Sequence, residues 1–208
     1  VSGNSIAING LGFAPSGTAT SVASADYTTG TTNTHWTIAG AQETTVQYTD
    51  CKSSTFKKML GGYGTFNSRT QVTRTLSGLA VHTTTRVTAT IAILDGWWSS
   101  ETFSVSLDSH TKVYSSADWV CNKDEDYACG KKYSDCVLNV DFTVPHTATT
   151  AKVTFQGNNF FSRTDRSWGM MAYKIQTSAT STYAATVGGV ACPITEITPY
   201  QIHCNAPA

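Results

Sequence analysis

The chain has 208 residues, a formal net charge of +0 and only 13% charged residues, against roughly 25% in an average soluble domain. Without net charge it has no field that would gather nucleic acid or an anionic lipid surface, so we expect neither as a partner. No apolar run reaches the roughly 18 residues of a membrane span. Threonine and serine supply most of the polarity, and threonine favours strands, so we predict an all-β protein.

The six cysteines have spacings that favour disulfides over metal binding or thiol redox chemistry. None of them forms the C-x-x-C pair typical of zinc sites and thioredoxin-like proteins. We therefore expect a secreted protein in an extracellular, oxidising setting or at a cell surface. Cys192 and Cys204 are close enough in sequence to pair across a hairpin. The pairing of the other four stays open: Cys51, Cys121, Cys129 and Cys136.

Two segments at the ends of the chain look like parts of one small domain. Residues 2–13 predict a strand with Ile6 and Ile8 on one face, followed by a Gly-Leu-Gly turn. This piece resembles the second strand of an IPT/TIG domain, an immunoglobulin-like β-sandwich. Residues 183–207, with V-G-G-V-A-C and then I-H-C-N-A-P, resemble the end of the same domain. The resemblance implies an Ig-like domain made of residues 1–16 and 182–208, interrupted by an inserted domain of residues 17–181.

The resembling domains begin with a further strand before a glycine pair, and Val1 starts too late to include it, so we expect this strand to be absent. An Ig-like sandwich without that strand exposes unpaired backbone N–H and C=O groups, which a strand from another chain can fill. We therefore expect head-to-tail assembly with itself, or contact with other surface proteins. A flexible or trimmed N-terminus is the alternative.

The inserted part shows the period-two alternation of half-buried antiparallel strands. Its first residues, 17–33, are so polar that we expect a surface loop or a sheet edge there. The longest predicted strand runs from Thr84 to Leu94, and in the last one Met171, Tyr173 and Ile175 are placed on one face. The other strands are predicted near Trp36, in residues 71–76, 103–107 and 138–144, and near Val113 and Val153. In residues 58–66 the sequence predicts a tight turn at Gly61 and Gly62 that leads into a further strand.

Five separated motifs follow one another in this part of the chain: Met59 to Tyr63, Leu79 with His82, Asp95 with Trp98 and Glu101, Val144 to His146, and Ser167 to Gly169. Their order resembles a jelly-roll-like β-sandwich domain of secreted and surface proteins of ciliates and other protists. The resemblance covers about residues 60–175. It implies a jelly-roll-like sandwich for residues 17–181, and capping or turn-holding roles for His82 and His146.

Acidic residues gather at the turn that follows the longest strand. Asp95 and Glu101, with Asp165 as a third ligand, could present oxygens to a hard cation such as calcium. The alternative is that these acids accept hydrogen bonds from backbone amides and hold the turn, with Arg166 available to pair with Asp95. Apart from this calcium hypothesis we expect no cofactor.

Two adjacent tryptophans, Trp97 and Trp98, occupy the same turn. Neighbours in an extended segment point to opposite faces, so we expect one ring in the core and the other offered to a sugar ring or a protein neighbour. The alternative is a bulge that buries both rings.

No catalytic residue is identified, because the chain has no G-x-S-x-G elbow, P-loop or dinucleotide-binding glycine run. Asp95 and Glu101 are the one carboxylate pair that we considered for glycoside hydrolysis, but both belong to a single turn, where we expect a structural role. We expect a non-enzymatic extracellular structural protein, a subunit of a surface layer or fibre assembled by strand addition at the incomplete Ig-like edge. The alternative is a carbohydrate-binding surface module that uses Trp97 or Trp98.

Overall fold

The computed structural model describes residues 5–9, 19–32, 35–40, 46–51, 53–67, 69–95, 97, 99–121, 129, 133–158, 166–179, 185–187, 189–192, 194–197 and 201–205. These residues form antiparallel strands and two short 3₁₀ turns, η1 (Tyr27–Thr29) and η2 (Ser116–Asp118). No α-helix occurs in these ranges, so the predicted all-β class is confirmed. The described part of the chain also holds no helix that is long and apolar enough to cross a membrane.

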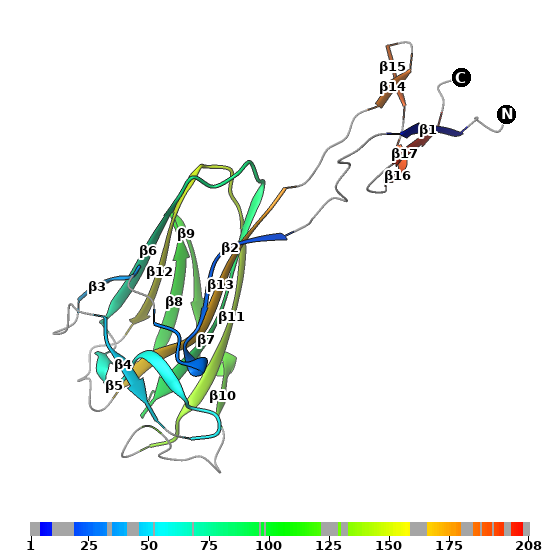
Figure 1. Cartoon of the computed structure of the whole chain (residues 1–208). Helices are drawn as coiled ribbons and strands as arrows, with labels where there is room; N and C mark the ends of the chain where they lie inside the picture. Colours follow the sequence, from blue (N-terminus) through cyan, green and yellow to red (C-terminus); the bar gives the residue numbers. More distant parts are fainter. Residues whose placement is uncertain are drawn as a thin grey trace.

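Two sheets face each other to form the large sandwich (Figure 1). The seven-stranded sheet has the order β10-β11-β7-β13-β5-β4, with β2 also paired to β13. Its strands are β10 (Trp119–Cys121), β11 (Cys136–Pro145), β7 (Thr84–Leu94), β13 (Ser167–Ser178), β5 (Lys58–Asn67), β4 (Tyr48–Asp50) and β2 (Ala19–Asp26). The five-stranded sheet has the order β3 (Thr37–Ala39), β6 (Gln71–Ser77), β12 (Thr150–Asn158), β8 (Thr102–Leu107) and β9 (His110–Tyr114).

The core lies between these sheets and is built from the apolar rows that the period-two pattern predicts. In β7, Val87, Ala89, Ile91 and Ile93 are all buried there. Large aromatic side chains fill the middle, and the ring of Trp168 lies 5.0 Å from those of both Phe66 and Phe103: the three rings come from β13, β5 and β8.

The polar segment 17–33, expected to be a loop or a sheet edge, contains the edge strand β2 followed by η1. Its Ala23 and Tyr27 are buried in the core, and the Tyr27 hydroxyl accepts a hydrogen bond from Trp36 Nε1 at 2.8 Å. Burial raises the pKa of Tyr27 well above its ordinary value, and this outweighs the lowering effect of the bond from Trp36. Of the two alternatives, the structure therefore shows the sheet edge, and Ala23 and Tyr27 add it to the core.

The predicted face of β13 is wrong at one residue. Tyr173 and Ile175 enter the main core, but the register against β7 shifts between Met170 and Ala172. This β-bulge turns Met170 into the main core and Met171 onto the opposite side of the sheet. There Met171 joins a second apolar cluster on the outer face with Phe56, Met59, Ala92 and Leu94.

The predicted turn at Gly61 and Gly62 lies inside β5 as an irregularity. Gly61 pairs with Gly169 of β13, and Phe66 pairs with the adjacent residue, Trp168. Residues 62–65 therefore fall outside the register with β13 and form a local insertion in the strand. Gly61 has a φ of 75°, and a Cβ there would lie 2.0 Å from the Phe66 ring. Glycine is thus required both for its backbone angle and for space.

The first and last strands of the chain pair with each other. β1 (Ser5–Asn9) lies beside β17 (Gln201–Asn205), and β16 (Ile194–Ile197) completes a three-stranded sheet. β14 (Ala185–Val187) and β15 (Val190–Cys192) form a separate hairpin. Residues predicted to share one Ig-like domain therefore do meet, while the division at residues 16 and 182 stays a prediction.

Candidate functional site

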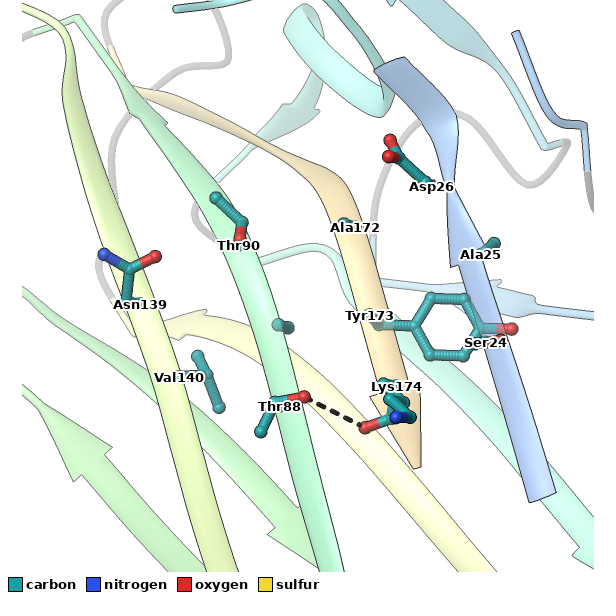
Figure 2. Close-up of a pocket in the computed structure, with 11 residues that line it drawn as sticks. Ser24, Ala25, Asp26, Thr88, Thr90, Asn139, Val140, Ala172, Tyr173 and Lys174 are labelled. Atoms are coloured by element: carbon teal, nitrogen blue, oxygen red, sulfur yellow. Dashed lines mark hydrogen bonds between the residues drawn. The ribbon is translucent and has the colours of Figure 1, made fainter. Parts of the chain in front are cut away.

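A hollow of about 410 Å³ lies over four strands of the seven-stranded sheet: β2, β13, β7 and β11 (Figure 2). The register aligns Asp26, Ala172, Thr90 and Asn139 in one row across these strands. Core residues alternate with them along each strand, so this row belongs to the outer face of the sheet.

A second row crosses the same strands one step further along. It contains Ser24, Lys174, Thr88 and Asp141, of which the first three line the hollow. The Thr88 hydroxyl donates to the carbonyl of Lys174 at 3.5 Å (Figure 2). In the first row the central residue, Ala172, has the shortest side chain, which leaves a depression between its longer neighbours.

Several polar groups around the hollow are available to a ligand. Asn139 and Lys174 are exposed and Thr90 is half-buried. Asp26 uses Oδ1 to accept the backbone N–H of Thr28 at 3.0 Å and its hydroxyl at 2.6 Å. The rim therefore carries hydroxyl, amide, carboxylate and ammonium groups around an apolar floor.

Charge near the hollow is balanced. Arg86 binds Asp141 through two hydrogen bonds, including Nε to Oδ1 at 2.8 Å. These bonds hold the pKa of the Asp141 carboxyl below its ordinary value, and the pair stays ionised and mutually neutralised at neutral pH. Lys174 and Asp26 supply one charge of each sign at the rim. The lining of the hollow thus carries no net charge.

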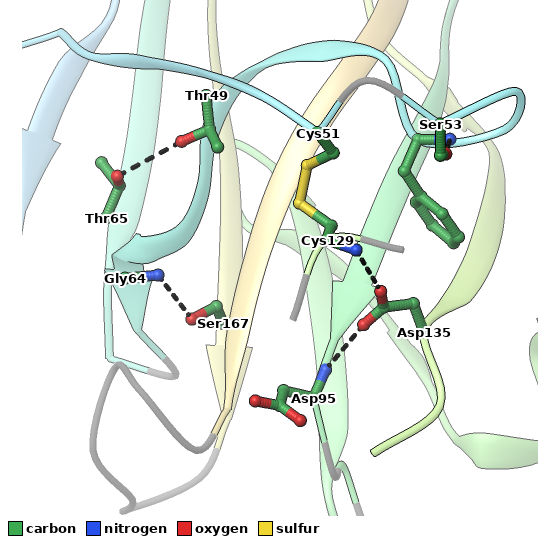
Figure 3. Close-up of a disulfide and its surroundings, with 10 residues drawn as sticks. Thr49, Cys51, Ser53, Gly64, Thr65, Asp95, Cys129, Asp135 and Ser167 are labelled. Atoms are coloured by element: carbon green, nitrogen blue, oxygen red, sulfur yellow. Dashed lines mark hydrogen bonds between the residues drawn. A yellow bond between two sulfur atoms is a disulfide. The ribbon is translucent and has the colours of Figure 1, made fainter. Parts of the chain in front are cut away.

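Beyond Thr90, toward the end of β7, this outer face is covered. Ala92 and Leu94, which follow Thr90 on the same face of β7, are buried in the second apolar cluster with Phe56. A disulfide between Cys51 and Cys129 holds this cover in place (Figure 3). The hollow therefore lies where the covered half of the sheet ends.

The tryptophan turn contributes no open aromatic platform among the described residues. Trp97 is half-buried, its Nε1 donates to the carbonyl of Ser167 at 2.9 Å, and its ring lies edge-on to Trp119 at 5.7 Å. Trp97 is therefore fixed against the core. Trp98 lies outside the described residues.

The acids near this turn bind backbone amides. Asp95, at a φ of 61°, accepts the N–H of Tyr133 at 2.7 Å, and its own N–H donates to Asp135 Oδ1 at 3.1 Å. Asp135 Oδ2 accepts the N–H of Cys129 at 2.8 Å (Figure 3). Asp95 and Asp135 are both fully buried. The residue patterns did not single out Asp135, because its role depends on a contact 40 residues away.

Glu101 and Arg166 form a buried ion pair, with the Arg166 Nε nitrogen facing Glu101 Oε1. Arg166, which we considered as a partner of Asp95, pairs with Glu101 in the structure. Asp165, the third residue of the calcium hypothesis, lies outside the described residues, and no group of three or more metal-binding side chains occurs within them. Two of the three suggested ligands are engaged with the protein itself.

All six cysteines are paired. Cys121 and Cys136 join directly opposite residues of β10 and β11, and Cys51 joins Cys129 over a separation of 78 residues. The third disulfide links Cys192 to Cys204, the pair that sequence proximity favoured.

The fold and these bonds define a disulfide-linked, all-β sandwich protein. The family model of the IPT/TIG domain matches residues 142–208, which include the end of β11, β12, β13 and the C-terminal strands. A comparison with curated proteins gave no match.

A comparison with solved structures found several that are similar to this chain at low sequence identity. The CBM22-1 xylan-binding domain of Paenibacillus barcinonensis Xyn10C is 11% identical, with a TM-score of 0.45, and the match covers 78% of this chain and 97% of that domain. Dimeric latent PorU from Porphyromonas gingivalis is 12% identical, with a TM-score of 0.41 over 95% of this chain and 20% of that one. An exo-β-1,3-galactanase from Phanerochaete chrysosporium is 14% identical, with a TM-score of 0.37, and the match covers 77% of this chain and 29% of that one. Similarity at this level does not indicate what this chain binds.

Proposed function

We propose that this protein is an extracellular, non-enzymatic module that binds a neutral glycan in the hollow on the outer face of the seven-stranded sheet. The observation that carries the proposal is the combination of an apolar floor at Ala172 with a charge-balanced rim of hydroxyl and amide groups. Three disulfides support an extracellular setting.

The lining suits a sugar because a sugar ring is itself amphipathic. Its C–H groups can rest on Ala172 and on the methyl groups of Thr88 and Thr90, while its hydroxyls reach the rim. Asn139 offers both a donor and an acceptor through one side chain, and Asp26 offers carboxylate oxygens to hydroxyl donors. A few polar groups placed around an apolar surface are the usual means of orienting a small ligand.

The same lining argues for binding rather than hydrolysis. Asp26 is the only carboxylate among the described residues that line the hollow, whereas glycoside hydrolysis generally uses two facing carboxylates. The binding surface also differs from the one predicted from sequence, because it lies on a sheet face and does not require Trp97.

Binding should be tested with an array of neutral oligosaccharides, followed by calorimetry on those retained. We expect Asn139→Ala to weaken affinity about tenfold, the size of one or two lost hydrogen bonds. Thr143→Ala is the matched control, because Thr143 is exposed on the same face of β11 and lies outside the hollow. Equal loss in both variants, or no retained glycan, would refute the proposal.

A specific feature also supports the second candidate, a fibre or surface-layer subunit. β1 is the edge of its three-stranded sheet and pairs only with β17 among the described strands. Its Ala7 is exposed, and a lysine on an edge strand discourages strand addition. If the protein forms polymers in sedimentation and negative-stain microscopy, Ala7→Lys should reduce them. A protein that stays monomeric at high concentration would exclude this candidate.

A further inference from the structure

One end of the sandwich holds a chain of hydrogen bonds that the proposed glycan site does not use. His82 lies in the connection from β6 to β7, His146 in that from β11 to β12, and Asp108 in the turn between β8 and β9. His82 Nε2 lies 2.7 Å from His146 Nδ1, and His146 Nε2 lies 3.0 Å from Asp108 Oδ2. Three connections that are distant in sequence are joined by these bonds.

The two imidazole rings are largely shielded from water. His82 is 3% exposed, the side chain of His146 is 7% exposed, and the rings stack with their centroids 4.9 Å apart. The Asp108 side chain is partly exposed. Because water cannot easily replace these partners, each ring nitrogen depends on the hydrogen bonds within the chain.

Counting protons along the chain gives a definite requirement. The Ala80 carbonyl, 2.6 Å from His82 Nδ1, can only accept, so this nitrogen carries a proton. The ionised Asp108 carboxylate can also only accept, so His146 Nε2 carries a proton. Both rings are then neutral. The two nitrogens that face each other, His82 Nε2 and His146 Nδ1, lie 2.7 Å apart and carry only lone pairs, so neither can donate to the other. That contact becomes a hydrogen bond only when the pair takes up one further proton.

Adding two protons to the histidine pair also prevents the hydrogen bond between the rings. With both rings cationic, N–H groups would face each other across the same 2.7 Å contact. The complete chain therefore requires a single imidazolium shared by the two rings and balanced by the negative charge of Asp108. Such a coupled pair takes up its protons in two steps, and the closed chain belongs to the state between them.

When the pair lacks the added proton, His146 Nδ1 has another possible hydrogen-bond partner. The hydroxyl of Thr85, which is fully buried, lies 3.3 Å from His146 Nδ1 and can donate to it once this nitrogen is deprotonated. His146 then keeps a hydrogen bond, while His82 Nε2 loses its partner. The site thus has two discrete arrangements.

Among the described residues, the Asp108 carboxylate is the only charged group that is bonded to either ring. Asp108 is held by the N–H of Lys152, which donates to its Oδ1 at 2.9 Å, and Asp108 N–H donates to the Lys152 carbonyl. The other titratable or charged side chains on the elements that pack here are Arg74, Arg86, His110, Lys112, Tyr114, Asp141, Lys152, Tyr173 and Lys174. None of them is bonded to His82 or His146.

We propose that His82, His146 and Asp108 form a proton-dependent latch that fastens the 78–83 loop to the 145–149 turn. The latch closes when the histidine pair holds one added proton and opens when rising pH removes it. A second added proton opens it as well. The turn-holding role suggested for the two histidines thus becomes conditional on pH.

The latch should be tested on the unmodified protein by nuclear magnetic resonance. Three backbone bonds report on the site: Leu79 N–H to Thr149 O, Thr83 N–H to Ser178 O, and His146 N–H to Thr83 O. We expect hydrogen-exchange protection of these amides, corrected for intrinsic rates, to fall roughly tenfold from pH 6 to pH 8, the size of one charge-assisted hydrogen bond. The side-chain nitrogen spectra should show three ring protons on the pair at pH 6 and two at pH 8.

Asp108→Asn gives the sharpest test because it should reverse the pH dependence. The asparagine oxygen can still accept from Lys152 N–H, and its amide can donate to His146 Nε2, so the chain is complete with two neutral rings. Asparagine also tolerates the φ of 49° found at Asp108. Protection in this variant should be higher at pH 8 than at pH 6.

His110→Gln is the matched control, since His110 is exposed on the neighbouring strand β9 and is not hydrogen-bonded to His82, His146 or Asp108. It should keep the wild-type pH response. Equal wild-type protection at both pH values, or an Asp108→Asn variant that responds like the wild type, would overturn the proposal. Two neutral rings at pH 6 in the spectra would do the same.

Discussion

Glu101 and Arg166 form an ion pair inside the protein, where they are only 3% and 5% exposed. Removing one partner leaves an uncompensated buried charge, which typically costs about 3–5 kcal/mol. We expect Glu101→Ala to lose about that much unfolding free energy in denaturant titrations. The double variant Glu101→Met with Arg166→Met should recover most of the loss, because it removes both charges and keeps the volume. A double variant as unstable as the single one would contradict this.

Gly169 should tolerate no side chain. A Cβ there would lie 2.4 Å from Met59 Sδ and 2.9 Å from the backbone nitrogen of Gly62, and backbone cannot move aside cheaply. We expect Gly169→Ala to destabilise the protein by roughly 2 kcal/mol or more through overpacking. Gly64→Ala is the comparison, since it has open space and only the strain of a φ of 71°, about 1 kcal/mol. Thermal unfolding should rank the two in this order.

Tyr27 should make stability fall at alkaline pH. Burial raises the pKa of its hydroxyl in the folded protein, so above about pH 10, where an unfolded tyrosine ionises, unfolding releases a proton. Stability is therefore lost as pH rises beyond that point. Tyr27→Phe should be less stable at pH 7, because Trp36 Nε1 loses its acceptor, but its stability should decline less between pH 9 and 11. Parallel curves for the two proteins would argue against this assignment.

The two disulfides of the large sandwich should differ in their effect on stability. Cys51–Cys129 closes a separation of 78 residues and Cys121–Cys136 one of 15, so chain entropy predicts contributions of about 4.5 and 3 kcal/mol. Replacing the first pair by serine should also loosen the outer apolar cluster around Phe56 and raise binding of a hydrophobic dye. The second replacement should leave dye binding close to the wild type.

Regular alternation made much of the sandwich predictable from sequence. The buried row of β7 and the rows of β8, β11 and β12 follow directly from the period of two. The error at Met171 arose because a bulge inserts one residue and reverses the side chains on one side of it. Such a shift depends on the partner strand and leaves no local pattern.

The candidate sites were harder to predict than the strands. The hollow depends on the register that places Asp26, Ala172 and Asn139 in one row, although these residues are far apart in sequence. The histidines were associated with turns, but nothing in their own sequence neighbourhoods showed that His82 and His146 meet. Tertiary contacts of this kind are set by the whole topology.

The pairing of β1 with β17 has a consequence for the order of folding. Ser5 lies opposite Asn205, 200 residues later, and such a contact would close a very long loop in an unstructured chain. Within the folded sandwich, however, Ala19 already lies opposite Ser178, so only the short arms beyond those residues remain to be joined. The sandwich therefore acts as a template that keeps two distant pieces within reach of each other. A cut in one of its surface loops would leave the terminal sheet assembled, whereas unfolding the sandwich would separate its halves.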